Sequence, residues 1–351
     1  MIITTASHHA RIMGRRCFGI AVAALTAAVA LTGAASAQTD VRFTLDWKIQ
    51  GPTGFLLHAA QQGLFAAEDL DVQVDVGNGS AGAVTRVASG AYQMGMADIN
   101  AVIDYNAANP DAMIKTVMMI YDAPPFGVYA LKGNGIETPA DLVGRTLGAP
   151  VFDASYKLFP AFAAANGFDP NDVPRNNMDP SLRETMLVRG EVDFISGHYF
   201  SSYLDLQARG VAAEDIVVMR YADYGMDFYG NALIVNPAFE AASPEAVTAF
   251  LQVAADSLKL MLEKPELAVE AAYTADPLID KDLEAARFEL AVNTNIVTEY
   301  TKANGFGDVD FERLQRAMDQ LKLAYGLDSM PTPDQIFDRQ YLPPVADRQL
   351  P

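Results

Sequence analysis

The chain has 351 residues, and 50% of them are hydrophobic, which is enough for one or two domains with apolar cores. It carries 44 acidic against 25 basic side chains, a formal net charge of −19. A surface with this excess of negative charge repels nucleic acid and anionic lipid, so we expect neither as a partner.

The N-terminus has the pattern of a secretory signal peptide over residues 1–37. Two arginines precede the apolar run CFGIAVAALTAAVALTG, and residues 35–37 form an A-x-A cleavage site. Cleavage is predicted after Ala37, and the apolar run is too short to favour a membrane anchor. We therefore expect a periplasmic protein that has lost Cys17, its sole cysteine, which excludes disulfides, thiolate catalysis and cysteine metal sites.

Strand and helix patterns alternate along the rest of the chain, which indicates an α/β fold. The predicted strands are 41–45, 70–76, 94–97, 115–121, 126–131, 145–148, 192–196, 216–220 and 232–235. The predicted helices are 55–65, the segment from the glycine loop to Ser89, 152–167, 181–188 and 198–209, followed by an almost wholly helical region from Ser243 to about Tyr325. The run from Thr138 to Asp141 is a capping box with proline at the first helical position. A helical tail after βα units is expected to wrap back over an earlier domain.

The stretch DVQVDVGNGSAGAVTRVASG contains the spacing G-x-G-x-x-G at Gly77, Gly79 and Gly82. In a dinucleotide-binding unit this turn follows a first strand that is buried on both faces and therefore continuously apolar. Here the preceding strand, 70–76, is the second in the chain, and it alternates apolar with polar residues, which predicts one solvated face. We interpret the loop as a cleft-facing turn at a helix N-terminus, whose amides at Gly79 and the next two residues are free to donate to ligand oxygens. The alternative is a tight turn that contacts nothing.

Five stretches carry a resemblance to a known family: LDW, QQGLFAAEDLDVQV, ASGAYQMGMAD, LKGNGIETPADLVGRTLGAP and DYGMDFYGNALIVN. They resemble the substrate-binding proteins of ABC importers. Within that group the chain is similar to the branch of nitrate, taurine, alkanesulfonate and thiamine-pyrimidine-precursor binders, and to the related fungal pyrimidine synthases. The resemblance covers about residues 41–330.

The resemblance implies a type II periplasmic-binding-protein fold, with two α/β lobes, a ligand cleft between them and two crossing segments. Lobe one would comprise 40–122 plus 232–351, and lobe two 123–231. It also implies hinge closure around the ligand, delivery to a membrane permease that works with a separate ATPase subunit, and action as a monomer. No G-x-x-x-x-G-K-[ST] pattern occurs in the chain, which fits an ATPase on another subunit.

Patterns that indicate catalysis are few. Only His58 and His198 lie beyond the predicted leader, so a histidine-rich metal site cannot be built. The paired carboxylates Asp223 and Asp227 have no nucleophile or metal ligand beside them. The fungal synthases that the chain resembles carry a lysine and a histidine after the third strand and a cysteine cluster later, where this chain has MGMADINA (94–101) and GMDFYG (225–230). We therefore expect a binding protein rather than an enzyme, with no cofactor, metal or catalytic residue.

The ligand is expected at loops that follow strand C-termini, where open α/β sheets bind their ligands. By this rule and by the family positions, the predicted ligand-binding residues are Asp46, Trp47, Gly79, Ser80, Asp98, Asn100, Tyr121, Phe152, Asp153, His198, Tyr199, Tyr224, Asp227 and Tyr229. For Trp47, Tyr199 and Tyr224 a place in the core or at its rim is the alternative.

The residue types in this set predict the class of ligand. Aromatic side chains at Trp47, Tyr121, Tyr199 and Tyr229 can stack on a flat ring, and aspartates can accept hydrogen bonds from its N–H groups. Arginine and lysine are scarce in the set, so we expect a nitrogen heterocycle of the thiamine-pyrimidine-precursor type. The alternative is a small anion such as an alkanesulfonate, nitrate or aromatic carboxylate, for which Arg86 or Arg183 would supply the charge. A periplasmic enzyme and a ligand-sensing module remain further alternatives.

Overall fold

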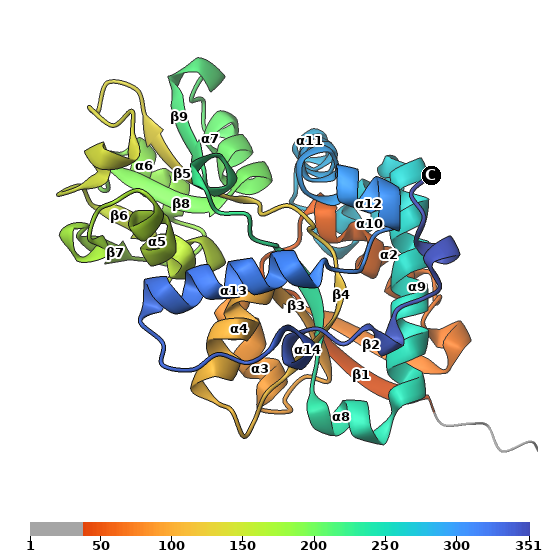
Figure 1. The fold of residues 1–351 in the computed structure, drawn as a ribbon. Helices are drawn as coiled ribbons and strands as arrows, with labels where there is room; N and C mark the ends of the chain where they lie inside the picture. The colour runs from red at the N-terminus through yellow and green to blue at the C-terminus, as the bar shows by residue number, and fades with distance from the viewer. Residues whose placement is uncertain (1–37) are drawn as a thin grey trace, which may run out of the picture. The chain divides into compact units, whose positions relative to one another are not determined.

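The computed structural model describes residues 38–351. The predicted signal peptide and its cleavage site lie outside the described residues. The described chain forms two mixed β-sheets, each flanked by helices, and we call each sheet with its helices a lobe (Figure 1). The α/β fold predicted from the alternating patterns is confirmed.

The first lobe is built on a five-stranded sheet with the order β2-β1-β3-β10-β4. Its strands are β1 (Thr39–Thr44), β2 (Leu70–Asp75), β3 (Met94–Asp98), β4 (Lys115–Met119) and β10 (Asn231–Val235). β1 runs parallel to β2 and β3, whereas β10 runs antiparallel between β3 and β4. β2 lies at the edge, and its apolar residues are buried or half-buried while Asp71 and Gln73 are exposed, in line with the solvated face that its sequence predicted.

Helices cover both faces of the first sheet. They are α2 (Gly54–Gln61), α3 (Ser80–Ala88), α4 (Ile99–Ala108), α8 (Pro237–Ala242), α9 (Pro244–Glu263), α10 (Pro265–Ala275), α11 (Lys281–Ala291) and α12 (Glu299–Asn304). Met94 and Met96 point to a core shared with α2 and α9, while Ala97 points to a second core with α3 and α4. Because strand side chains alternate between faces, β3 is buried along its whole length.

The second lobe is built on a sheet with the order β7-β6-β8-β5-β9, shown in yellow to green in Figure 1. Its strands are β5 (Phe126–Leu131), β6 (Leu147–Ala149), β7 (Arg175–Asn177), β8 (Phe194–His198) and β9 (Ile216–Arg220), and its helices are α5 (Ala154–Ala165), α6 (Arg183–Val188) and α7 (Leu204–Ala208). β5 is antiparallel to both β8 and β9, and β6 is parallel to β7 and β8.

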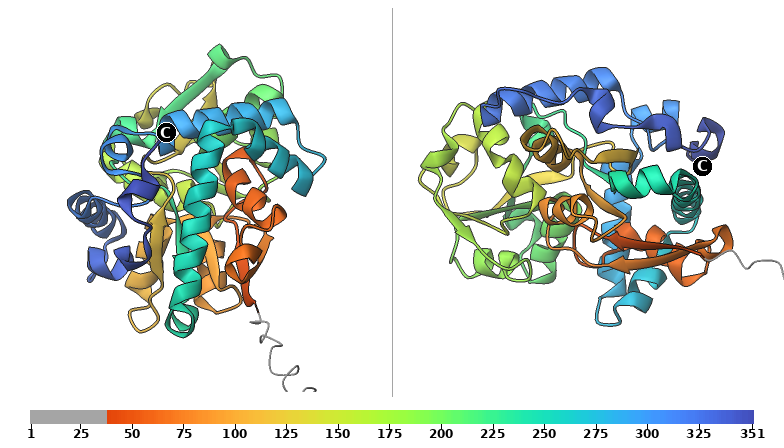
Figure 2. Two further views of the ribbon diagram at one scale, coloured as in Figure 1. Left: turned by 90° about the vertical axis from the view of Figure 1, so that its right-hand side faces the viewer. Right: turned by 90° about the horizontal axis from the view of Figure 1, so that it is seen from below.

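The chain crosses between the lobes twice, at 120–125 and at 221–230. The two crossings are hydrogen-bonded to each other, because Gly230 donates its amide to the carbonyl of Tyr121 at 2.9 Å. The C-terminal helix α13 (Phe311–Tyr325) packs on α5 of the second lobe and on α4 of the first, and Figure 2 shows it from two further directions. A last short helix, α14 (Pro333–Ile336), packs on α4.

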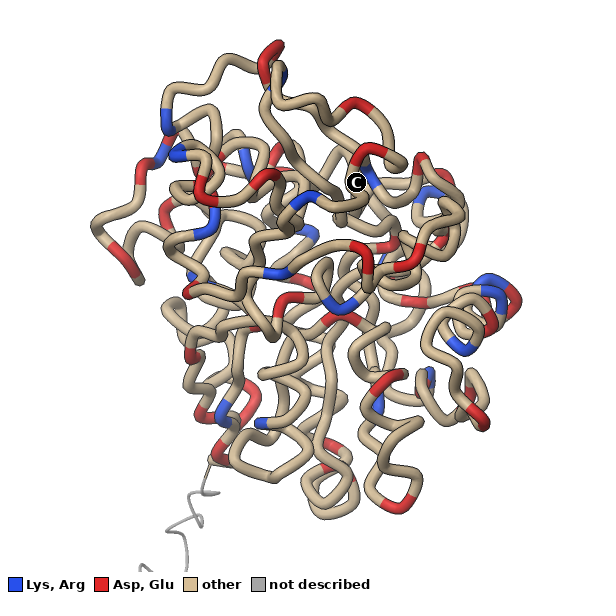
Figure 3. The backbone as a smooth tube through the Cα atoms, turned by 90° about the vertical axis from the view of Figure 1, so that its left-hand side faces the viewer, with Lys and Arg blue, Asp and Glu red and all other residues tan. Residues whose placement is uncertain are grey.

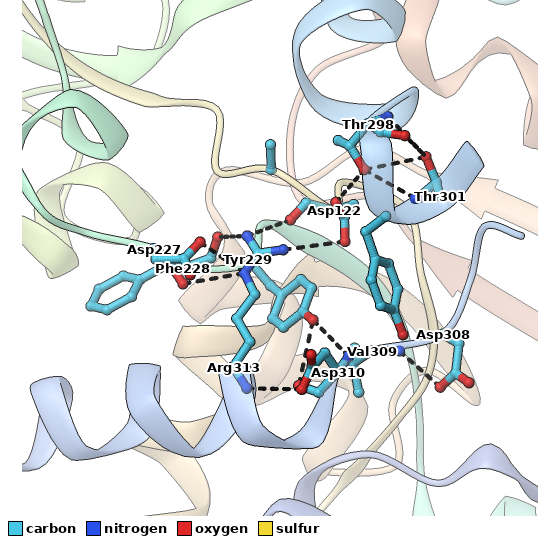
Figure 4. Close-up of polar contacts among 12 residues, drawn as sticks. Asp122, Asp227, Phe228, Tyr229, Thr298, Thr301, Asp308, Val309, Asp310 and Arg313 are labelled. Carbon is cyan, nitrogen blue, oxygen red and sulfur yellow. Dashed lines mark hydrogen bonds and ion pairs between the residues drawn. The ribbon is translucent and has the colours of Figure 1, made fainter. Parts of the chain in front are cut away.

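Arg313 of α13 binds both crossings (Figure 4). Its Nη2 donates to the carbonyl of Asp122 at 2.9 Å and to that of Phe228 at 2.8 Å, and its Nη1 lies 3.3 Å from Asp122 Oδ1. The guanidinium also lies over the ring of Tyr229, 4.0 Å from its centroid. One side chain therefore binds both of the segments that connect the lobes.

The secondary structure differs from the prediction in several places. Helix α4 was not predicted; it begins directly after β3, where the carboxylate of Asp98 accepts the amides of Asn100 and Ala101. Strand β7 was also missed, because it is three residues long and polar. The capping box at Thr138 heads a single 3₁₀ turn rather than a helix. The helix expected over 198–209 begins with a π-helical turn, Tyr199–Tyr203, before α7.

Acidic and basic positions are interspersed over the described chain (Figure 3). Within residues 38–351, none of the helices is both long and apolar enough to cross a bilayer. The helical tail returns to the first lobe as predicted, since α9 and α10 both pack on α2.

Candidate functional site

A small cavity lies between the lobes, at loops that follow the carboxyl ends of strands. Its lining residues are Asp46, Trp47, Gly79 and Ser80 of the first lobe and Asp153, Ala154, Arg183, His198 and Ser201 of the second. The cavity measures about 10 Å³, which is room for about one water molecule. Two sheets whose strand ends face one another across a gap are a typical arrangement for binding a small molecule.

Trp47 is the only tryptophan of the chain, and it forms one side of the cavity. Its side chain is largely buried, and the guanidinium of Arg183 lies 5.1 Å from the ring system across the lobes. The indole Nε1–H is buried and has no hydrogen-bond partner among the described residues. Trp47 can therefore offer a ligand both an aromatic face and a donor.

Asp46 is fully buried beside Trp47. Its Oδ2 accepts a hydrogen bond from Asn231 Nδ2 at 2.6 Å and from Ser80 Oγ at 3.2 Å. Burial raises the pKa of Asp46 to about 6, although both donors oppose that rise. The carboxyl group therefore changes charge within the range of mildly acidic to neutral pH.

Arg183 is the only arginine or lysine in the lining, and its charge is balanced by two neighbouring carboxylates. Its Nη1 lies 3.0 Å from Asp153 Oδ2, and its Nε lies 2.7 Å from Glu184 Oε1, with all three side chains buried. Two carboxylates therefore balance one guanidinium, and Asp46 adds a third acidic group. The site as a whole has no surplus of positive charge for an anion.

Gly197 allows Arg183 to reach this position. A Cβ on Gly197 would lie 3.0 Å from Arg183 Cζ and 2.1 Å from Ser202 Oγ, so a larger residue would displace both side chains. Ser196 Oγ and Ser202 Oγ are buried here without hydrogen-bond partners in the described structure.

His198 ends strand β8 and is packed edge-on against two aromatic rings, those of Phe126 and Phe200. Burial lowers the pKa of His198 to about 4, and the neighbouring Asp153 opposes this only in part. At neutral pH the imidazole is therefore uncharged, with one nitrogen able to donate and one able to accept.

The glycine loop does face the cavity, but two of its three predicted free amides, those of Gly79 and Ala81, are hydrogen-bonded. Gly79 donates its amide to the carbonyl of Asp46 at 2.6 Å, and Ala81 donates to the carbonyl of Phe152 in the other lobe at 3.2 Å. Gly79 has φ +139°, and a Cβ there would lie 2.2 Å from the Phe152 oxygen. The glycine loop therefore contacts the backbone of the other lobe at Phe152. A residue with a side chain at Gly79 would prevent this close contact.

The cavity brings together six of the predicted residues: Asp46, Trp47, Gly79, Ser80, Asp153 and His198. The others lie outside its lining. Asp98 caps α4, and Asn100 donates to the carbonyl of Tyr229. Phe152 meets the glycine loop through its backbone, and Tyr121 packs edge-on against Phe200.

The remaining aromatic residues of the predicted set have partners elsewhere. Tyr199 stacks on Tyr203, and Tyr224 packs against Phe162. The hydroxyl of Tyr229 accepts the amide of Asp310 at 2.7 Å beneath Arg313, and Asp227 is an exposed partner of the same arginine (Figure 4). Of the four predicted stacking rings, only Trp47 lines the cavity.

Three lining residues were outside the predicted set: Ala154, Arg183 and Ser201. Arg183 had been considered only as a source of charge for an anion. It opens α6 after a polar segment, and no local sequence signal distinguishes it from a surface arginine. No group of three or more histidine, cysteine or carboxylate side chains suited to a metal ion occurs in the part of the chain that the structure describes.

The model of the NMT1/THI5-like family matches residues 53–268, more than half of the chain. The chain belongs to this family. A formylaminopyrimidine-binding protein of Halalkalibacterium halodurans is 29% identical over 236 residues, which cover 67% of this chain and 70% of that protein. A 4-amino-5-hydroxymethyl-2-methylpyrimidine phosphate synthase of Legionella pneumophila is 22% identical over 89% of this chain and 96% of the relative.

The fold is that of periplasmic binding proteins. The alkanesulfonate-binding protein SsuA of Xanthomonas axonopodis pv. citri superposes with a TM-score of 0.66 at 13% identity, covering 87% of this chain and all of that chain. The two-lobed fold and the family resemblance predicted from the sequence are thereby confirmed.

Proposed function

We propose that the protein is a periplasmic solute-binding protein that captures a small nitrogen heterocycle of the pyrimidine type between its lobes and delivers it to an ABC permease with a separate ATPase subunit. The observation that carries the proposal is the interlobe cavity, in which a tryptophan with a free N–H faces an arginine already balanced by two carboxylates. The ligand contacts are Asp46, Trp47, Gly79, Ser80, Asp153, Arg183 and His198.

The charges of the lining favour a neutral or cationic ligand over an anion. An anion would have to compete with Asp153 and Glu184 for Arg183 while lying near Asp46. An aminopyrimidine can donate its N–H groups to Asp46 or Asp153, and it can either stack on the face of Trp47 or accept from the indole N–H at the ring edge. The name of the formylaminopyrimidine-binding relative supports the same class.

The proposal includes movement of the lobes. A cavity of about 10 Å³ cannot hold a six-membered ring, since pockets for small ligands measure about 300 Å³ or more. The ligand therefore enters while the lobes are apart, and they close around it by bending at the two crossings. We keep 40–122 plus 232–351 and 123–231 as the proposed lobe boundaries, and action as a monomer as part of the proposal.

The proposal assigns no catalytic step to the chain. The segment after β3 has Asn100 and Ala101, with neither the lysine nor the histidine of the synthases that the chain resembles, and 225–230 contains no cysteine. The synthase among the relatives makes a direct control worthwhile: incubation with an aminopyrimidine should return the compound unchanged by mass spectrometry.

Fluorescence of Trp47 tests the function directly, because it is the sole tryptophan and lines the cavity. Titration with an aminopyrimidine is expected to give a saturable change, whereas propanesulfonate and nitrate should give none at the same concentrations. Saturable binding of the sulfonate or nitrate without the aminopyrimidine would overturn the proposed ligand class in favour of an anion held by Arg183.

A further inference from the structure

We infer that Arg287 is a positioning residue that latches the two lobes together, holding from the first lobe the cavity wall that belongs to the second. Arg287 lies on helix α11, is fully buried and is outside the cavity lining. The inference rests on the proposed function in one respect, that closure of the lobes governs retention of the ligand.

Arg287 makes three contacts with the second lobe. Its Nη2 lies 2.7 Å from Asp205 Oδ1 on α7, and its Nη1 donates to the carbonyls of Ser201 at 3.1 Å and Phe200 at 3.3 Å. Ser201 lines the cavity. Because all three contacts cross between the lobes, they exist only while the lobes are together.

The contacted wall is the π-helical turn Tyr199–Tyr203. Turns of this kind are rare and often occur at functional sites, where they aim particular groups. Here two consecutive carbonyls, those of Phe200 and Ser201, accept from one guanidinium. Arg287 therefore fixes both the position and the orientation of the turn that carries Ser201.

The same helix also holds the opposite wall. Glu284, which pairs with Arg287 Nε at 3.0 Å, accepts the amide of Gly51 at 2.7 Å through its other oxygen. A Cβ on Gly51 would lie 2.4 Å from the Glu284 carbonyl, so the loop that carries Asp46 and Trp47 is seated directly on α11. Helix α11 thus connects one wall of the cavity to the other.

Two direct contacts run beside this connection. Gln50 Nε2 donates to Ser201 Oγ at 3.0 Å, and Lys48 Nζ lies 3.3 Å from Asp205 Oδ2. Burial alone would raise the pKa of Asp205, but Arg287 and Lys48 outweigh it and lower that pKa below its ordinary value. Asp205 is therefore ionised at neutral pH, so the contact between Arg287 and Asp205 joins two charged groups.

The test uses Asp205→Asn, which keeps the shape of the side chain while removing the charge, with Arg287→Lys as a second variant that retains a cation. The control is Glu299→Gln, which breaks an exposed ion pair with Lys302 inside the first lobe. Lobe separation is measured between spin labels on cysteines introduced at the exposed positions Glu68 and Asn134, in a chain that also carries Cys17→Ser.

We expect Asp205→Asn to shift the label distances toward longer values and to raise the dissociation rate of an aminopyrimidine, followed by Trp47 fluorescence, by about tenfold, with little change in the association rate. Arg287→Lys should lie between this variant and the parent, and Glu299→Gln should match the parent. Unchanged distances in both latch variants would overturn the inference. The distances need no ligand, so failure of the aminopyrimidine to bind would count against the proposed function alone.

Discussion

Asp46 is the residue at which proton and ligand are coupled in the proposed site. Burial raises its pKa to about 6, so the carboxylate is mostly charged at neutral pH and gains a proton as the pH falls. A ligand that donates N–H groups binds the charged form, so it should release protons from the protein near pH 6 and bind more weakly below it.

Isothermal titration calorimetry with an aminopyrimidine near pH 6, in two buffers of different ionisation enthalpy, measures this proton release. Asp46→Asn should abolish the buffer dependence while retaining donors and acceptors at the same place. Proton uptake on binding by the parent protein would contradict the assigned role of Asp46.

Individual site residues could be predicted where their position along a strand identifies them, and could not where contacts with distant segments place them. Asp46, Trp47, Asp153 and His198 each lie at or shortly after the end of a strand, so the rule about strand C-termini was enough to find them in the cavity lining. Arg183 could not be found in this way, because its place depends on Gly197 and Asp153 from two other segments, as well as on the adjacent Glu184. Tyr199 and Tyr229 were predicted as ligand-stacking rings; in the structure Tyr199 stacks on Tyr203 of the same turn, and Arg313 lies over the ring of Tyr229.

The glycine loop before α3 yields a prediction about closure. Gly79→Ala would place a Cβ about where the carbonyl of Phe152 lies in the other lobe, so it should weaken aminopyrimidine binding by at least about tenfold. Gly63→Ala is the matched control, since Gly63 also has positive φ but has open space around its Cβ position.

Two measurements on the parent protein, Gly79→Ala and Gly63→Ala separate an effect on binding from an effect on stability. They are the ligand affinity from Trp47 fluorescence and the melting temperature. Gly79→Ala should lose more stability than Gly63→Ala, because φ +139° with ψ 151° is a region open essentially to glycine alone, and only Gly79→Ala should lose affinity. Equal affinities for the two variants would show that the contact between the Gly79 loop and Phe152 has no part in closure.

Helix α13 carries two arginines, Arg313 and Arg316, whose contributions to stability can be compared. Arg313→Gln removes the partner of Asp122, which is buried, and should destabilise the fold by about 3 kcal/mol because a buried carboxylate is left unpaired. Arg316→Gln on the same helix breaks only an exposed contact of 3.9 Å with Asp227 and should cost less than about 1 kcal/mol.

Urea denaturation of both variants at neutral pH tests this difference. Similar midpoints for Arg313→Gln and Arg316→Gln would mean that the crossings are held by their backbone hydrogen bonds rather than by the arginine. Figure 4 shows why we expect otherwise, since Arg313 reaches Asp122 and Phe228 from a single position.

Helices and strands whose sequence has a regular apolar pattern or a strong β-propensity could be predicted. Elements whose conformation depends on a cap or on contacts with distant segments could not. The strand over Leu70–Asp75 and the strand over Phe126–Leu131 were found close to their true bounds from side-chain alternation or β-propensity. Helix α4 has mixed polar and β-branched residues and owes its start to the Asp98 cap. The π-helical turn Tyr199–Tyr203 has no known sequence pattern and is stabilised by Arg287 from a distant segment.

At the scale of the whole molecule, one continuous stretch of chain contacts both the cavity walls and the first crossing between the lobes. Helix α11 holds both cavity walls, and the π-helical turn that follows it, Val292–Ile296, exchanges two hydrogen bonds with Ala123 of the first crossing through Asn295. Thr298 then donates to Asp122 at 2.5 Å. The residues that hold the cavity walls and those that bind the first crossing are therefore continuous in sequence.

The two-lobed architecture could be predicted because the family resemblance extends over about residues 41–330. The contacts between lobes could not, since they join residues far apart in sequence, such as Gln50 with Ser201 and Arg287 with Asp205.

The most direct test of the proposed site is native mass spectrometry of the protein purified without unfolding, followed by denaturation and identification of any released small molecule. We predict a neutral or cationic nitrogen heterocycle that the parent protein retains and Trp47→Ala does not. Release of a sulfonate, nitrate or carboxylate that Trp47→Ala still retains would contradict the proposed site and its ligand class.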